Sequence, residues 1–142
     1  MANAWDIADD TLAAQLEAWR AVIMDEPDYE MHLYKNNYTP APGSAIGNYT
    51  EADFDGYAAQ PIVAADWGNV TLLNHVASIQ SDTPCEFVAD AGPGPGQEIF
   101  GYYVTDSDGA YLWGERFQIS RTVNPEDTLS VTAIMRHATL PV

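Results

Sequence analysis

The sequence predicts a mainly β chain, a single β-sandwich or small β-barrel domain with one N-terminal amphipathic helix and long loops. Three observations predict it. Apolar residues at helical spacing are confined to the first part of the chain, and short alternating runs separated by glycine, proline, asparagine and aspartate follow. The length of 142 residues is typical of one domain. We therefore expect an N-terminal arm over residues 1–8 and a single β-rich domain over residues 9–142.

The N-terminal helix is expected over about residues 10–24. Its apolar stripe consists of Leu12, Leu16, Trp19 and Ile23. Asp9 or Asp10 can accept hydrogen bonds from the first-turn amides, and Pro27 ends the helix. We expect the stripe to face the core, with docking onto a neighbouring subunit as the alternative. Trp5, on the short acidic arm, is the better candidate for an intermolecular contact.

The remaining chain is expected to form strands joined by turns and exposed loops. Strands are predicted over residues 31–35, 56–63, 70–79, 86–89, 98–105, 110–119 and 128–135. Proline, glycine and asparagine predict exposed loops over residues 36–44 and 47–55, and residues 92–96 read as a mobile loop. Asp106-Ser107-Asp108-Gly109 supplies the turn of a hairpin whose arms carry many aromatic residues. We expect that hairpin to form the core of the sheet.

Charge restricts the partners of this chain. It carries 21 acidic and 5 basic residues, for a formal net charge of −16. A phosphate-binding face needs clustered lysine and arginine, so nucleic acid and anionic membranes are disfavoured as partners. An acidic surface favours solubility or docking onto a basic partner. No apolar run is long enough to span a membrane, and residues 1–6 lack the positive flank of an export signal.

The search for chemistry predicts no catalytic, metal or cofactor site. The glycine-rich residues lack the lysine and following helix of phosphate-binding loops, and the three histidines fit no zinc spacing. Asp106-Ser107-Asp108-Gly109 resembles the start of a calcium loop, but Phe117 stands at the twelfth position, which favours a hairpin turn. Asp53 and Asp55 are read as a solvated loop, and Cys85 as a small core side chain. Spacing alone leaves a serine or cysteine nucleophile open.

Five segments of the sequence carry a resemblance to a known group of proteins. They are residues 32–40, 49–58, 99–106, 112–117 and 124–131. Together they resemble small virion structural proteins of tailed bacteriophages, over about residues 30–132. The resemblance implies a virion part such as a capsid decoration or cement protein, with no catalytic residues to carry over. Similar sequences often have a glycine before the aspartate of the last segment, whereas this chain has Pro125-Glu126-Asp127, which alters that turn.

Charge then favours one place in a virion. Carboxylates repel the DNA inside a packed shell, so a net charge of −16 favours the outer capsid surface, after synthesis in the host cytoplasm. The expected partners are the major capsid protein and further copies of this chain in a closed homotrimer.

Aromatic residues on extended segments are the usual anchors of such contacts, which indicates Trp5, Tyr38 and Tyr49 as interface residues. The alternative is that each aromatic side chain holds its own loop to its own core. The alternative function is a tail-fibre or tail-tip module that binds a host surface glycan or another tail protein. Exposed Trp67 and Tyr57 would contact the glycan in that case.

Overall fold

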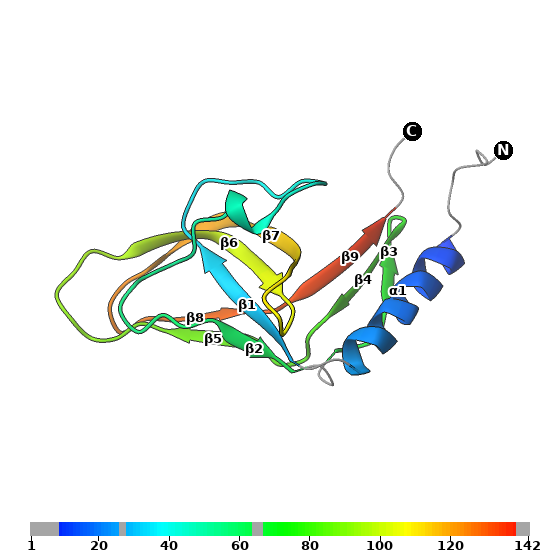
Figure 1. Ribbon diagram of the computed structural model, residues 1–142, viewed down its shortest axis with the longest axis horizontal. Helices are drawn as coiled ribbons and strands as arrows, with labels where there is room; N and C mark the ends of the chain where they lie inside the picture. The colour runs from blue at the N-terminus through cyan, green and yellow to red at the C-terminus, as the bar shows by residue number, and fades with distance from the viewer. Residues whose placement is uncertain (1–8, 26–27, 64–66, 139–142) are drawn as a thin grey trace.

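The computed structural model describes residues 9–25, 28–63 and 67–138. It is mainly β, with 45% of residues in strands and 13% in helices, and has one α-helix near the N-terminus (Figure 1). The predicted fold class is therefore confirmed, and the sheets are consistent with a small β-sandwich. The expected arm over residues 1–8 lies outside the described residues.

The α-helix comes first in the chain, and the strands follow it. They are α1 (Asp9–Asp25), β1 (Tyr29–Tyr34), the 3₁₀ turn η1 (Ile46–Asn48), β2 (Gln60–Ile62), β3 (Thr71–Leu73), β4 (Val76–Gln80), β5 (Cys85–Val88), β6 (Gln97–Thr105), β7 (Tyr111–Val123), β8 (Thr128–Val131) and β9 (Ile134–Ala138). The helix differs from its predicted bounds by one residue at each end. Leu12 and Leu16 are buried as expected, whereas Trp19 is 56% exposed.

The strands form three antiparallel sheets, in the orders β2-β1-β6-β7, β3-β4-β9 and β5-β8. The first and third sheets enclose most of the core, and we call them together the barrel half (Figure 1). Helix α1 packs on the β3-β4-β9 sheet, and these four elements are called the helical lobe. Strand β9 crosses from the barrel half into the helical lobe.

Two segments that were each predicted to be one strand form two strands instead. Residues 70–79 form β3 and β4, joined at Asn74 and His75, which have φ angles of 50° and 61°. Positive φ at both central residues is the mark of a two-residue type I′ hairpin turn, and asparagine tolerates that conformation. Neither residue is glycine, so the turn left no strong signal in the sequence.

Residues 128–135 are divided between β8 and β9 because side chains from the barrel half hold the chain where it changes sheet. The N–H of Ile134 donates to the Tyr102 hydroxyl at 2.9 Å, and its carbonyl accepts from the Trp113 indole at 3.0 Å. The N–H of Ala133 donates to Ser81 Oγ at 3.2 Å. These contacts come from residues distant in sequence, and no local pattern announces them.

The other strand predictions differ mainly in length. The strand expected over 56–63 is reduced to β2, which lies at a sheet edge, the position where Pro61 is tolerated. The hairpin predicted around Asp106 is present, with the Asp106 carboxylate accepting from the N–H groups of Asp108 and Ala110 at 2.9 and 2.8 Å. Strand β6 of this hairpin is central and buried, whereas β7 is an edge strand. Cys85 is buried, as predicted.

Candidate protein-protein interface

The loop after β1 folds over the outer face of the four-stranded sheet and forms a cluster of aromatic rings there. Tyr34, Tyr49 and Tyr103 are buried in it, and Tyr38, Phe100 and Tyr111 pack around them. We call these six residues the tyrosine cluster. The sequence predicted an exposed loop over residues 36–44 and 47–55, but it could not show that aromatic residues from both ends of the loop meet on the sheet.

Tyr49 is held entirely by its own chain. Its ring stacks on Tyr103 at a centroid distance of 4.7 Å and meets Tyr34 edge-on at 5.0 Å. Its hydroxyl lies 2.7 Å from the Tyr111 hydroxyl, and only 8% of the residue is exposed. Within its own chain Tyr49 therefore anchors its own loop, the alternative that the sequence left open.

Tyr38 has a similar role and is only partly buried. Its hydroxyl hydrogen-bonds Ser44 Oγ at 2.5 Å, and its ring contacts Tyr49 edge-on at 5.1 Å. Its carbonyl accepts from the Tyr34 hydroxyl and from Arg116, each at 3.0 Å. Trp5 lies outside the described residues. A contact of any of the three aromatic residues with a partner stays a prediction.

Two glycines make the tyrosine cluster possible. A Cβ at Gly101 would overlap the carbonyl oxygen of Glu115 and the ring of Tyr34, and a Cβ at Gly114 would overlap the Tyr49 hydroxyl. Sequence reasoning missed both glycines because each lies inside a strand with no turn signal; glycine within a strand is itself a mark of close approach. Burial raises the pKa of Tyr34 and of Tyr103 to about 12.

His32 ties the same loop to the sheet. Its Nδ1 lies 2.7 Å from a Glu51 carboxylate oxygen, its Nε2 lies 2.9 Å from Thr105 Oγ1, and its ring stacks on Tyr103 at 4.8 Å. The Tyr57 hydroxyl donates to the same Glu51 oxygen at 2.9 Å. All of these polar groups are used in structural contacts.

The acidic loop residues do not assemble a metal centre in the described part of the chain, where no group of three histidine, cysteine, aspartate or glutamate side chains has that geometry. The Asp53 carboxylate instead receives Lys35 Nζ and Gln97 Nε2, each at 2.7 Å. These hydrogen bonds, from Lys35 first and Gln97 second, lower the pKa of Asp53.

Of the two aromatic residues expected to contact a glycan, Trp67 is buried and Tyr57 is partly buried. Trp67 is 2% exposed and packs near Trp113 at a ring distance of 6.1 Å. Tyr57 stacks on Phe87 at 5.9 Å, and its hydroxyl accepts from the N–H of Leu33 at 3.1 Å. The expectation of exposure was therefore wrong for Trp67, whereas Tyr57 is only partly buried, with its ring packed against the core.

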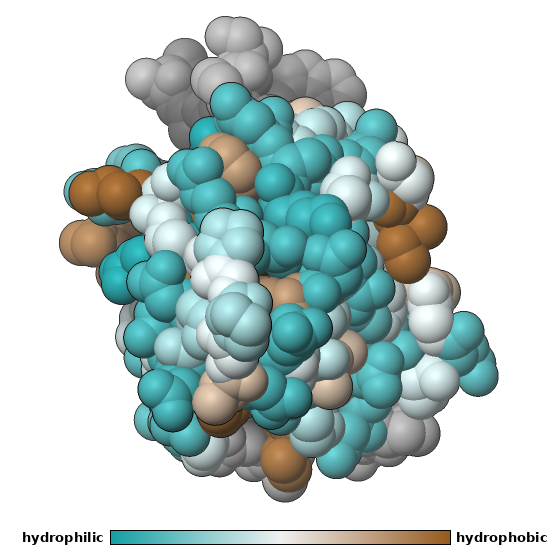
Figure 2. All heavy atoms as spheres, turned by 90° about the vertical axis from the view of Figure 1, so that its left-hand side faces the viewer, coloured by the Kyte–Doolittle hydropathy of each residue, from teal (hydrophilic) through white to brown (hydrophobic). Residues whose placement is uncertain are grey.

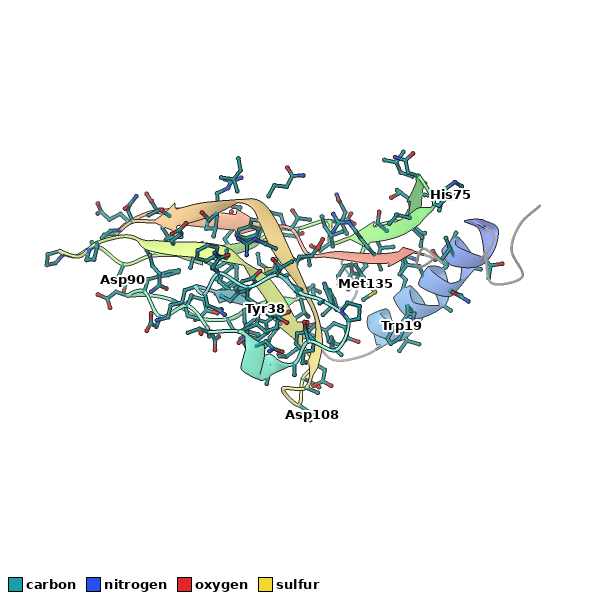
Figure 3. The ribbon with its side chains drawn as sticks, turned by 90° about the horizontal axis from the view of Figure 1, so that it is seen from above. Trp19, Tyr38, His75, Asp90, Asp108 and Met135 are labelled. Atoms are coloured by element: carbon teal, nitrogen blue, oxygen red, sulfur yellow. The ribbon has the colours of Figure 1, made fainter. Side chains whose placement is uncertain are left out.

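An apolar groove lies between α1 and the barrel half. It has a volume of about 220 Å³ and is lined by Leu16, Trp19, Tyr29, Leu112, Trp113, Met135 and Arg136. We call it the Trp19 groove. Figure 3 shows Trp19 on α1 close to Met135 of β9. Trp19 is 56% exposed and Leu112 37% exposed, so large apolar side chains reach solvent here.

The opposite end of the molecule, which carries Asp90 in Figure 3, has a different surface. Figure 2 looks onto this end and shows a mostly hydrophilic face, with apolar side chains only as separate small areas. A single exposed tryptophan in an apolar groove is typical of a protein contact site, whereas scattered apolar atoms are normal on any surface. The Trp19 groove is therefore the candidate interface.

The helical spacing of Trp19 was visible in the sequence, but its neighbours Leu112 and Met135 come from distant strands. Within the described residues, α1 is too short and polar to cross a membrane. Comparison with known proteins adds no relative: no family model, no curated protein and no solved structure matches this chain. Its function must therefore be inferred from its own residues.

Proposed function

We propose that this chain is a non-enzymatic structural protein of a tailed-phage virion that binds the outer surface of the head shell as a decoration or cement protein. The observation that carries the proposal is the Trp19 groove, where a half-exposed tryptophan borders an apolar surface. Tryptophan is enriched among the residues that dominate binding energy at protein interfaces. The resemblance to virion proteins supplies the context of a shell.

The charge of the chain supports the outer position. With a net charge of −16, the protein would be repelled by packaged DNA on the inner surface. The same charge keeps free copies soluble before they attach to the outer surface. The major capsid protein is the proposed partner, and self-association into a homotrimer would repeat each weak contact around the local symmetry axis.

The contact itself would bury Trp19 between Leu112 and Met135 on this chain and an apolar group of the shell. Arg136, at the rim of the groove, pairs with Glu115 and so does not leave an isolated charge to be buried. Burial of an unpaired charge would cost several kcal/mol and would argue against docking there. The groove thus combines an apolar centre with a paired rim, the usual anatomy of an interface.

The test is binding to heads that lack this protein. Trp19→Ala should weaken binding by about thirty-fold, the equivalent of about 2 kcal/mol. Val22→Ala is the matched control, because Val22 is 53% exposed on the same helix and does not line the groove. Equal binding by both variants would contradict the proposal.

Copy number separates the head from the tail. A decoration protein should be present in purified virions at a copy number comparable with the major capsid protein. A small fraction of that amount would instead favour the tail-fibre or tail-tip alternative. Because Trp67 is buried and Tyr57 is partly buried, that alternative lacks the fully exposed aromatic pair on which a glycan site was expected.

A further inference from the structure

The barrel half is open along one side, between β7 and β8. Hydrogen bonds join β7, β6, β1 and β2 in that order, and join β5 to β8. Strands β2 and β5 lie beside each other, with Cys85 Sγ 3.6 Å from the Pro61 carbonyl. Among the described residues no strand pairing joins β8 to β7. The facing edges of β7 and β8 therefore offer unpaired backbone N–H and C=O groups.

The space between these edges is a groove of about 420 Å³. Its walls include Phe117 and Ile119 from β7 and Leu129 from β8. Ile119 is 76% exposed, although it lies within a strand. An added strand here would meet hydrogen-bonding edges on its sides and apolar side chains on one face, the two requirements of strand addition.

The groove also gathers positive charge in a strongly acidic protein. Arg116, Arg121 and Arg136 line it, and the whole chain has only 5 basic residues. Arg136 pairs with Glu115, and Arg116 donates to the Tyr38 carbonyl at 3.0 Å. Arg121 has no ion pair with any described residue. An extended segment that places a carboxylate beside Arg121 is the complementary occupant.

We propose that residues 1–8 of a second copy of this chain bind as an added strand in the groove between β7 and β8. The sequence Trp5-Asp6-Ile7 alternates apolar, acidic and apolar residues, so an extended segment places Trp5 and Ile7 on one face and Asp6 on the other. The apolar face matches Phe117 and Ile119, and the carboxylate matches the arginines. Eight extended residues span about 26 Å, more than the length of β8.

The occupant comes from a second copy because of where the helix starts. Helix α1 begins at the end of the molecule away from β5 and β8 (Figure 1), so Asp9, the residue that follows the arm, lies far from this chain's own groove. Exchange of identical arms between copies closes a ring without any additional protein. The inference rests on the proposed function, since such exchange is how decoration subunits would hold one another.

The first experiment measures the oligomeric state by sedimentation at micromolar concentrations. The full chain should be an oligomer, and both deletion of residues 1–8 and Ile119→Asp should yield monomers with an unchanged circular dichroism spectrum. Val88→Asp is the control, because Val88 is a 53% exposed strand residue outside the groove, and it should stay oligomeric. An oligomer that survives the arm deletion overturns the proposal.

A mixing experiment distinguishes a second copy from the same chain. The arm-deleted chain retains an intact groove, and the full-length Ile119→Asp chain retains an intact arm, so the two monomers should associate one to one when mixed. A peptide of residues 1–10 should also bind the arm-deleted chain, and Trp5→Ala with Ile7→Ala in that peptide should weaken binding by at least about ten-fold. Peptide binding without association of the mixed chains would mean that each arm occupies its own groove, which overturns exchange.

Binding to heads is measured on the same variants, so that failure of arm exchange can be distinguished from failure of the decoration role. A chain that forms the exchanged oligomer but does not bind heads contradicts the decoration role and leaves exchange intact. A full-length chain that binds heads but is monomeric in solution overturns exchange and leaves the decoration role intact.

Discussion

The barrel half and the helical lobe differ in how the two faces of their sheets are covered. In the barrel half both faces of the four-stranded sheet are covered, one by the core and the other by the tyrosine cluster. In the helical lobe the β3-β4-β9 sheet has α1 on one face, and Leu73 is 74% exposed. The comparison shows that aromatic rings cover the second face of the four-stranded sheet, whereas large apolar side chains of the helical lobe, Trp19 and Leu73, reach solvent.

The two regions are nevertheless joined by one cluster of buried side chains. It includes Leu12 and Leu16 of α1, Ile79 of β4 and Met31 of β1. Cooperative unfolding requires such a shared core. The difference between the regions is therefore one of surface, and the experiments below test whether it is also one of stability.

The largest expected loss of stability follows the addition of a side chain at Gly101, where backbone and ring atoms approach closely under the tyrosine cluster. Gly101→Ala places a Cβ against the Glu115 carbonyl and the Tyr34 ring, and the carbonyl belongs to the backbone of β7, which is paired with β6. We expect a loss of about 3 kcal/mol in the free energy of unfolding, measured by urea denaturation. Gly92→Ala is the control, because a Cβ there meets no atom within 4 Å. Equal stability of the two variants would show that the sheet relaxes around the added methyl group.

The next effect tests the helical lobe. Leu16 is 1% exposed, and Leu16→Ala should lower the free energy of unfolding by about 3 kcal/mol. Because Leu16 shares its core with the barrel half, the loss should appear in one transition seen both by circular dichroism and by tryptophan fluorescence. Val22→Ala, on the same helix but exposed, should change stability by less than about 0.5 kcal/mol. Two separate transitions for Leu16→Ala would show that the lobe unfolds independently.

High pH should destabilise the fold through the tyrosines of the barrel half. All eight tyrosines lie in its strands and loops, and burial raises the pKa of Tyr34, Tyr102 and Tyr103 to about 12, against an ordinary value of 10.0. Burial also holds the pKa of Tyr49 and of Tyr57 well above that value.

Since the unfolded chain loses these protons first, the resulting stability is complete below pH 10 and is lost as the pH rises from about 10 to 12. The free energy of unfolding measured across that range should fall steadily, and Tyr103→Phe should make the fall shallower. A free energy of unfolding that stays constant up to pH 12 would mean that the tyrosine hydroxyls have the same pKa in the folded and unfolded states.

Features that depend on neighbouring residues could be predicted from the sequence, whereas surfaces that combine residues from distant segments could not. The helical spacing of Leu12 and Leu16 indicates α1, and Asp106 to Gly109 carry the chemistry of their own turn, so both were predictable. The tyrosine cluster, the Trp19 groove and the gap between β7 and β8 each need residues far apart in the chain. Burial decides whether an aromatic residue is core or interface, and Trp67 and Trp19 exchanged those roles relative to expectation.

The smallest expected effect concerns a turn in the barrel half. Glu126 has a φ of 70°, in the left-handed region that favours glycine. Pro125 precedes it, and the N–H of Asp127 donates to the Asn124 carbonyl at 3.0 Å, the arrangement of a type II turn with positive φ at its third residue.

A side chain in this conformation costs about 1 kcal/mol, and glycine does not incur that cost. Glu126→Gly should therefore raise the free energy of unfolding by up to about 1 kcal/mol, because the backbone bond from its N–H to the Asp90 carbonyl is kept. Glu86→Gly, in β5, should instead lower it by about 1 kcal/mol, since an extended strand residue gains nothing from glycine. If both variants lose stability, the backbone at Glu126 is not strained.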